Sequence, residues 1–334
     1  MGLLPSRPKF LCRWLSAATR LYSPMPSSSK TSAAAKPSRY CAVVVTYNPD
    51  LTALLKLLGQ LEKDSDFIVV DNGSKNIEEL AASIEVYSRC RAVEKVGDNI
   101  GLSRALNKGI AWVKEHGYEF VFLFDQDSRP GDLFAQGLIS ALERASKFSS
   151  KGVAAVGPRI MNPQSMKQTP FKLFNRLLGR TNRRFEGLRT EFKADFLITS
   201  GTLIPLSIID AVGPMRDDYF IDNIDLEWCF RAKALGYDLV GSDASILYHA
   251  IGERSDHPWV RAGIIAQHNP SRSYYSSRNR VHLYGVDYAP LGWKLRDMPR
   301  FALKALWLML SSAQRSSYFT SIRRGIRDAR TLPK

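Results

Sequence analysis

The sequence predicts an α/β fold with a mostly parallel, twisted sheet flanked by helices. Apolar runs rich in β-branched residues alternate with amphipathic segments over residues 40–128, and short polar loops join them. This alternation is typical of βα units that build a parallel sheet. With 334 residues and 45% hydrophobic content, the chain can bury a large core. Polar residues follow the strand ends, which meet at the edge where open α/β sheets bind ligands.

Each expected element has its own signal. The β-branched run at 41–46 predicts a strand buried on both faces, and the leucine spacing at 51–61 predicts an amphipathic helix. The run at 67–71 repeats the strand pattern and leads into a turn signal, Asp-Asn-Gly-Ser. The further elements, in order, are a helix from 77 to about 87, a strand at 91–96, a helix from 99 to 113, a strand at 120–125 and a helix at 225–235.

The charge of the chain is strongly positive. Lys and Arg number 47 against 32 Asp and Glu, a formal net charge of +15, which raises nucleic acid, an anionic membrane or a phosphorylated ligand as partners. The first 38 residues contain no acidic residue and are rich in Ser, Ala, Pro and basic residues. We expect them to form a disordered basic segment outside the fold. Their composition also fits an organelle transit peptide, and a start at Met25 is a second alternative.

The four cysteines lie far apart in the sequence. They form no C-x-x-C pair, and no histidine stands at zinc-finger spacing from them. We therefore expect reduced thiols, as in a cytosolic protein, with Cys41 and Cys229 filling the core.

Two carboxylates close the strand expected at 120–125. Asp125 and Asp127 are two residues apart, and strand side chains alternate between faces, so both can point the same way at the strand's carboxyl end. The chain has no G-x-G-x-x-G after the first strand and no G-x-x-x-x-G-K-[ST], so a diphosphate there needs another neutralising group. A divalent metal held by carboxylates meets that need. The alternative is a solvated turn, because Asp-Ser-Arg-Pro-Gly follows.

Four motifs stand in order along the chain: VVVTYN at 43–48, VVDNGS at 69–74, NIGLSRALNKG at 99–109 and DQD at 125–127. Together they resemble the successive motifs of the inverting glycosyltransferases of family 2, which have the GT-A fold. The resemblance extends from about residue 41 to about residue 284. It implies a Rossmann-like, nucleotide-sugar-binding domain at 39–288, between the disordered segment 1–38 and a basic amphipathic helical segment at 289–334.

Finer motifs narrow this resemblance: DQDS at 125–128, FIDNIDLEWCFRA at 220–232, YHAIG at 248–252 and YYSSRN at 274–279. They are similar to those of the dTDP-rhamnose-dependent rhamnosyltransferases of bacterial surface polysaccharide assembly. The resemblance implies transfer of L-rhamnose from dTDP-rhamnose to a lipid-linked or polysaccharide acceptor, as in O-antigen-type lipopolysaccharide synthesis. Two alternatives stay open: the same fold with another donor, a UDP-hexose or galactofuranose nucleotide, and a basic RNA-binding protein.

The resemblance also implies roles for single residues. Asp127 would ligate Mg²⁺ or Mn²⁺ and His249 would complete the metal site, although a lone histidine after a strand is otherwise a structural residue. The metal would stabilise negative charge on the departing nucleoside diphosphate. Thr46 and Asn48 would lie under the nucleotide, Asp71 at the base or ribose, and Asp125 on the ribose side. The other residues implied in nucleotide-sugar binding are Asn99, Gly101, Asn107 and Arg278.

Inversion needs one general base that accepts the proton of the acceptor hydroxyl. We assign this role to Asp222, which lies where a loop enters a helix. Many relatives carry adjacent acids here, whereas this chain has Asn223 beside Asp222, so Asp225 is the alternative base. A competing structural interpretation is that Asp222 caps the helix. Glu227 and Arg231, four residues apart, are expected to form a helix salt bridge.

Two further basic stretches predict surfaces. Residues 162–189 interleave seven Lys or Arg with three Phe and suit a diphosphate-linked lipid acceptor or a solvated insertion; in isolation the pattern would suit RNA. Residues 301–310 are too short to span a bilayer. With their basic flanks they fit an interfacial amphipathic helix, or a helical cap on the domain.

We therefore expect a cytoplasmic protein, peripheral on the inner face of the plasma membrane. Its expected partners are dTDP-rhamnose, a lipid-diphosphate-linked sugar acceptor and the anionic membrane surface, with no nucleic acid.

Overall fold

A computed structural model describes residues 39–174, 180–249, 269–312 and 314–333. Ser38–Lys334 forms one compact unit. The expectations for residues 1–38, including the transit-peptide and Met25 alternatives, lie outside the described residues. So does the end of the YHAIG motif.

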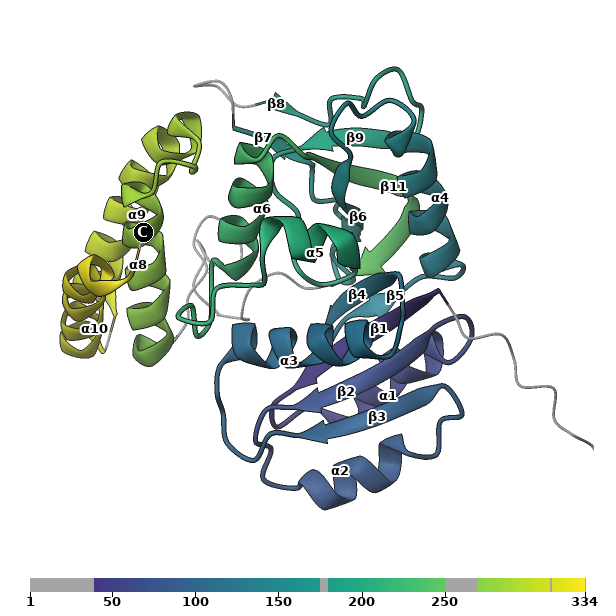
Figure 1. Cartoon of the computed structure of the whole chain (residues 1–334). Helices are drawn as coiled ribbons and strands as arrows, with labels where there is room; N and C mark the ends of the chain where they lie inside the picture. The colour runs from purple at the N-terminus through teal and green to yellow at the C-terminus, as the bar shows by residue number, and fades with distance from the viewer. Residues whose placement is uncertain (1–38, 175–179, 250–268, 313, 334) are drawn as a thin grey trace, which may run out of the picture. The chain divides into compact units, whose positions relative to one another are not determined.

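A nine-stranded sheet organises this unit (Figure 1). Its strand order is β3-β2-β1-β4-β10-β6-β11-β5, and β9 pairs with β11. The strands are β1 (Tyr40–Thr46), β2 (Asp66–Asp71), β3 (Cys90–Lys95), β4 (Phe120–Asp125), β5 (Arg129–Pro130), β6 (Val153–Met161), β9 (Glu191–Ala194), β10 (Thr202–Pro205) and β11 (Asp238–Tyr248). Strands β7 (Lys172–Leu173) and β8 (Arg180–Thr181) form a separate pair.

The sheet is parallel over β3, β2, β1 and β4 and mixed beyond them. Strand β1 pairs in parallel with β2 and β4, so that Thr46 lies opposite Asp71, and Val45 lies opposite Asp125. Strand β10 then runs antiparallel between β4 and β6, whereas β6 and β11 are parallel. The α/β fold class is confirmed, and the strand ends of β1, β2 and β4 share one edge as expected.

Helices cover both faces of the sheet. Alternate residues of β1 point to opposite sides, so Ala42 and Val44 belong to one hydrophobic cluster, and Val43 and Val45 to another. The first cluster includes α1, α2 and α4, and the second includes α3, α5 and α6, as Figure 1 shows for α3, α5 and α6. These helices are α1 (Leu51–Leu61), α2 (Ile77–Ile84), α3 (Leu102–Glu115), α4 (Phe134–Ser146), α5 (Leu206–Val212) and α6 (Ile224–Ala234).

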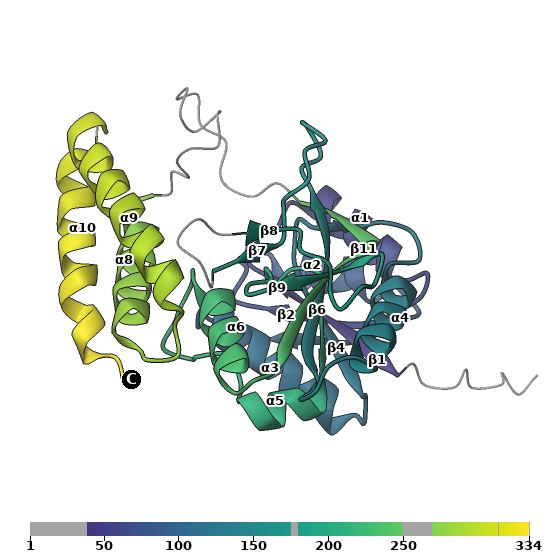
Figure 2. The same ribbon diagram turned by 90° about the horizontal axis from the view of Figure 1, so that it is seen from above.

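Three helices follow the sheet: α8 (Pro270–Gly285), α9 (Leu291–Ser311) and α10 (Arg315–Asp328), with a short 3₁₀ turn, η1 (Ala329–Thr331), after them. They run alongside one another in Figures 1 and 2. Leu308 of α9 and Ile322 of α10 are buried together, and Trp307 packs against their cluster. Within the described residues, no helix has the length and apolar character needed to cross a bilayer.

The elements expected between residues 41 and 125 all form. Helix α1 has the expected bounds, whereas α2 ends at Ile84, about three residues early. It ends there because the chain turns back and the Tyr87 hydroxyl donates a hydrogen bond to the Leu55 carbonyl of α1 (3.2 Å). Cys41 and Cys229 are buried free thiols, as expected.

Candidate functional site

A cavity of about 670 Å³ lies at the carboxyl ends of β1 and β4. Its volume falls within the usual range for ligand pockets. Seven of the residues singled out from the sequence line it: Thr46, Asn99, Asp125, Asp127, Asp222, Asp225 and His249. The fold therefore gathers strand ends, the α6 loop and the end of β11 around one space.

Asp125 ends β4 and Asp127 lies in the turn after it, so strand alternation does not orient Asp127, but both carboxylates lie near His249. His249 lies between them, with Nε2 4.0 Å from Asp125 Oδ2 and Nδ1 3.7 Å from Asp127 Oδ1. Desolvation raises the pKa of the Asp125 carboxyl, the nearby His249 opposes the rise and Asp127 adds to it. The Asp127 side chain is 61% exposed, whereas that of His249 is 13% exposed. An accessible carboxylate thus stands beside an imidazole that the protein holds in place.

These groups fit a divalent cation that takes part of its ligands from a bound nucleotide. Mg²⁺ is commonly bound by one or two carboxylates together with substrate phosphates and water. No cluster of three His, Cys, Asp or Glu side chains able to hold a metal by itself occurs in the described part of the chain. Asp127 and His249 can therefore hold such an ion only together with ligand oxygens or water.

Asp222 is held by an arginine. Arg272, in the first turn of α8, donates to Asp222 Oδ1 from Nη2 (2.9 Å) and from Nε (3.1 Å), and both residues line the cavity. Asp222 has a left-handed φ of 67°, which a non-glycine residue adopts only where its surroundings enforce it. The residue at the N-cap of α6 is Asn223, with no side-chain capping bond. The capping interpretation of Asp222 is therefore wrong.

Asp225 differs from Asp222 in its surroundings. It accepts a hydrogen bond from the Leu226 backbone N–H (2.8 Å), and the described residues place no Lys, Arg or His within ion-pair distance of it. Desolvation raises the pKa of Asp225 to about 7, and the charges of Asp125 and Asp222 contribute to the rise. A carboxylate with this pKa can accept a proton near neutral pH, which is what a general base does.

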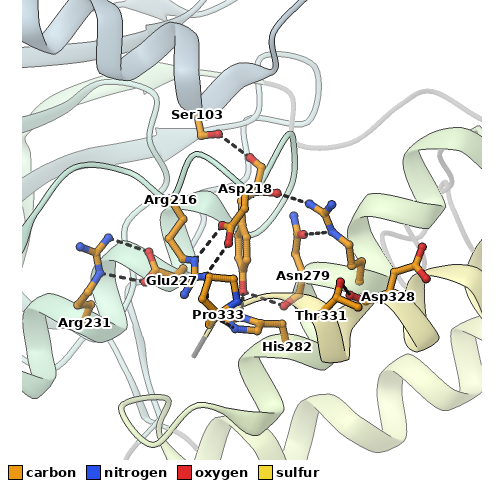
Figure 3. A network of polar contacts seen from close by, with 12 residues as sticks. Ser103, Arg216, Asp218, Glu227, Arg231, Asn279, His282, Asp328, Thr331 and Pro333 are labelled. Atoms are coloured by element: carbon orange, nitrogen blue, oxygen red, sulfur yellow. Dashed lines mark hydrogen bonds and ion pairs between the residues drawn. The ribbon is translucent and has the colours of Figure 1, made fainter.

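The loop that carries Asp222 is fixed from two sides (Figure 3). Ser103 of α3 donates to the Tyr219 carbonyl (2.7 Å), and the Tyr219 hydroxyl lies 2.6 Å from His282 Nδ1 of α8. Asn279 of α8 is fully buried and donates to the Asp222 carbonyl (2.9 Å). The backbone of Asp222 is therefore anchored independently of its side chain.

Two of the expected nucleotide-binding residues are not among those that line the cavity: Asp71 is buried, and Asn48 is exposed. Asp71 is buried and accepts hydrogen bonds from Thr46 Oγ1 (3.0 Å), the Ser74 hydroxyl (2.5 Å) and the backbone N–H groups of Gly73 and Ser74. Asn48 binds the Lys75 N–H through Oδ1 (3.0 Å). The side chains of Asp71 and Asn48 hold neighbouring loops together, and their expected contacts with the nucleotide stay a prediction.

Asn99 and Gly101 shape the neighbouring wall. Asn99 Oδ1 accepts a hydrogen bond from Asn72 Nδ2 (3.1 Å), and both asparagines line the cavity. Gly101 has a φ of 93°, and a Cβ there would lie 2.9 Å from the Phe220 carbonyl oxygen. The Leu102 N–H donates to that same oxygen (2.7 Å). Gly101 is thus required by a close backbone approach, and its expected contact with the nucleotide sugar has no support here.

Asn107 and Arg278 lie away from the cavity. Asn107 exchanges two hydrogen bonds with the Met215 backbone (2.7 and 3.0 Å). Arg278 donates to the Asp218 carbonyl and lies over the Tyr275 ring at 5.2 Å. Both residues join α3 or α8 to the loop before α6, so the expected role of either in binding the nucleotide sugar is not matched by its position.

The cavity is also lined by residues to which the sequence analysis assigns no role. Tyr47, Asn72, Gln126 and Phe220 stand within the quoted motifs, whereas Arg272 lies outside all of them. A helix-start signal was available for Arg272, because Asn269 and Pro270 form an N-cap followed by proline at the first position. The need for a cation beside a diphosphate could then have singled it out.

The basic and aromatic stretch at 162–189 is mostly explained by packing. Phe171, Phe174 and Phe185 are all buried, so the interleaved aromatic residues do not form an exposed surface, although Phe171 lines a smaller cavity. The expected helix salt bridge also forms, with Arg231 Nε 2.9 Å from Glu227 Oε1.

Two sequence comparisons match this chain to known glycosyltransferases. The family model for Glycosyl transferase family 2 matches residues 41–199. The dTDP-rhamnosyl transferase RfbF of Shigella flexneri is 31% identical over 267 residues, which cover 78% of this chain and 85% of that protein.

Solved structures share the fold at low sequence identity. The mannosyltransferase PcManGT from Pyrobaculum calidifontis, in complex with GDP-Man and Mn²⁺, aligns with a TM-score of 0.53 at 16% identity, over 90% of this chain and 77% of that chain. S. aureus TarS in complex with UDP-GlcNAc aligns with a TM-score of 0.55 at 14% sequence identity, over 87% of this chain and 81% of that chain. GalNAc-T7 with UDP, GalNAc and Mn²⁺ gives 0.53 at 13%, over 82% of this chain but only 56% of that chain. These likenesses confirm the GT-A fold, and the extended identity to RfbF shows that this chain is a glycosyltransferase that belongs to family 2.

Proposed function

We propose that the protein is an inverting, metal-dependent rhamnosyltransferase that moves L-rhamnose from dTDP-rhamnose to a lipid-linked glycan. The 31% identity to a dTDP-rhamnosyl transferase supports the donor. The observation that carries the chemistry is the position of Asp225. A carboxylate with a pKa of about 7 faces the same cavity as the Asp127 and His249 pair.

The diphosphate of the donor would lie between two walls of the cavity. On one wall, Asp127 and His249 would hold Mg²⁺ or Mn²⁺, which stabilises negative charge on the leaving diphosphate when it is bound. On the other wall, Arg272 provides a cation for the same charge, and Asp222 fixes its guanidinium through two hydrogen bonds. Asp222 thus acts as a positioning residue in this proposal.

Asp225 would be the general base. It accepts the proton of the acceptor hydroxyl while the hydroxyl oxygen forms a bond to the anomeric carbon of the donor sugar. The bond from that carbon to the diphosphate oxygen breaks, and its electron pair leaves with the nucleoside diphosphate. Attack from the side opposite the leaving group inverts the anomeric centre. We prefer Asp225 to Asp222 because the Asp222 carboxylate is already paired with Arg272.

Competition between donors tests this function. dTDP-rhamnose should be used in preference to dTDP-glucose, UDP-glucose and UDP-galactofuranose in one assay with Mn²⁺ and a lipid-diphosphate sugar acceptor. Equal or better transfer from a UDP-sugar would move the protein to the alternative donor class. Proton NMR of the first product would show whether the anomeric configuration is inverted.

The C-terminal helices support a membrane-associated location. Several leucines of α9 are exposed, among them Leu303, Leu306 and Leu310. Exposed arginines on α10, such as Arg323, add positive charge, and each cation near anionic lipid contributes about 1 kcal/mol. We propose that α9 docks on an anionic membrane surface.

The exposed leucines provide the test of docking. Replacing Leu303, Leu306 and Leu310 together by Glu should abolish flotation with phosphatidylglycerol vesicles and leave transfer to a soluble acceptor unchanged. Leu235→Glu, at an exposed leucine next to α6, is the matched control. Unchanged flotation of the triple variant would contradict docking through α9.

A further inference from the structure

A second cavity adjoins the first. It has a volume of about 250 Å³ and is lined mainly by apolar side chains. These include Pro158, Ile160, Phe171, Phe196 and Leu197. Asp225 and Ile198 line both cavities, so the two spaces meet at the carboxylate that we propose as the base.

The position of Asp225 between the two cavities indicates what the second cavity could bind. In a displacement at the anomeric carbon, the base must reach the acceptor hydroxyl, and that hydroxyl must face the donor sugar. A group bound in the second cavity has the Asp225 carboxylate as a polar partner where the two cavities meet, and Thr169, Lys172 and Thr202 also line the space. Its other surroundings suit the C–H faces of a sugar ring or a deoxy position, because they offer aromatic and aliphatic surface.

The rim of the second cavity is positively charged. Lys172 of β7 lines it. The pKa of Lys172 is lowered by desolvation and by the charge of Arg300 from α9. Arg296, one turn earlier on α9, donates to the carbonyl of Leu173, next to Lys172 (3.4 Å). Basic residues therefore lie together on the Lys172 side of the second cavity.

We propose that the second cavity binds the acceptor sugar, and that Lys172 at its rim selects an acceptor whose sugar is linked directly to phosphate. This inference rests on the proposed function, because it assigns the acceptor side of the same reaction. It goes beyond that function by naming the subsite and the chemical class that the subsite prefers. The apolar wall favours a sugar that presents few hydroxyls to it.

Two variants test the two parts of the proposal. Thr169→Trp places a large side chain on the wall of the second cavity, away from the donor cavity. Lys172→Glu reverses the charge at the rim. Lys167→Glu is the matched control, because Lys167 is an exposed lysine on the same loop that does not line the cavity.

Binding and transfer are measured separately. Isothermal titration compares two ligand series on protein loaded with dTDP and Mn²⁺. The first series contains hexoses and deoxyhexoses linked to a short alkyl diphosphate, and the second contains the same sugars as methyl glycosides. Thr169→Trp should weaken binding of both sugar series by at least about tenfold, with melting temperature and dTDP affinity unchanged. Lys172→Glu should weaken only the diphosphate series, by about tenfold, whereas Lys167→Glu should match the parent protein.

Failure of this inference can be told from failure of the proposed function. Acceptor binding that Thr169→Trp leaves unchanged would overturn the acceptor subsite, and equal effects of Lys172→Glu and Lys167→Glu would overturn the preference for phosphate. Absence of Mn²⁺-dependent dTDP binding in the parent protein would instead contradict the donor side of the proposed function.

Discussion

The ends of β1 and β2 differ from the end of β4 in how their polar groups are satisfied. Asp71, at the end of β2, is buried under hydrogen bonds from Thr46 and the 73–74 loop. Asp125, at the end of β4, is desolvated beside His249, and Asp127 next to it is exposed. The same residue type at equivalent strand ends is therefore structural in one place and available to a ligand in the other. What distinguishes them is whether the surrounding chain supplies donors.

The largest effect is expected at Asp127. If the β4 end is the ligand side, Asp127→Ala should abolish transfer and Mn²⁺-dependent binding of dTDP while the melting temperature stays within about 2 °C of the parent. The exposed Asp132→Ala variant, on the loop after β5, should behave like the parent. Full activity of Asp127→Ala across a metal titration would contradict the assignment of the β4 end to the ligand side.

The next effect separates the two candidate bases. Asp225→Asn should lower turnover by roughly 100-fold or more, with donor affinity unchanged, because only the proton acceptor is lost. Asp222→Asn should weaken donor binding more than it lowers turnover, because its carboxylate fixes Arg272. The reverse pattern would return the role of base to Asp222.

These expectations also show where sequence patterns stop. The β-branched runs and the spacing of Asp125 and Asp127 predict the parallel half of the sheet and its ligand edge, since both signals are local. Strand β10 has only four residues and pairs with strands distant in the sequence, so no local pattern predicts its antiparallel insertion.

The candidate site divides in the same way. A motif singles out Asp71 and Asn107 but does not tell whether their side chains face a ligand. In the structure, Asp71 binds Thr46 and the 73–74 loop, and Asn107 binds the Met215 backbone. Arg272 has no motif of its own, and its place beside Asp222 depends on how α8 packs. Tertiary hydrogen bonds, which a linear pattern does not contain, decide these roles.

A smaller effect is expected from the dependence of turnover and stability on pH. The Asp225 pKa is about 7 in the folded protein against an ordinary value of 3.8, so turnover should rise with pH and level off above about 7. Because folding favours the protonated form, Asp225 supports stability fully below the unfolded pKa, and this support is lost as the pH rises toward 7. Asp225→Asn should therefore gain melting temperature relative to the parent between pH 4 and pH 8. A constant difference over that range would contradict the raised pKa.

The smallest effect concerns the structural strand ends. Thr46→Val keeps the shape of a fully buried side chain and removes one of the donors to Asp71. The buried carboxylate keeps its donors from Gly73 and Ser74 but loses one hydrogen bond, which should cost about 1.5 to 3 kcal/mol of unfolding free energy because the acceptor is charged. The dTDP affinity should stay within about threefold of the parent, a change of under about 1 kcal/mol in binding free energy. Thr52→Val, at an exposed threonine of α1, is the matched control and should change neither quantity. Urea denaturation and dTDP titration measure the two effects on the same samples. If Thr46→Val instead weakened dTDP binding at unchanged stability, Thr46, which lines the cavity, would be a nucleotide contact and not mainly a partner of Asp71.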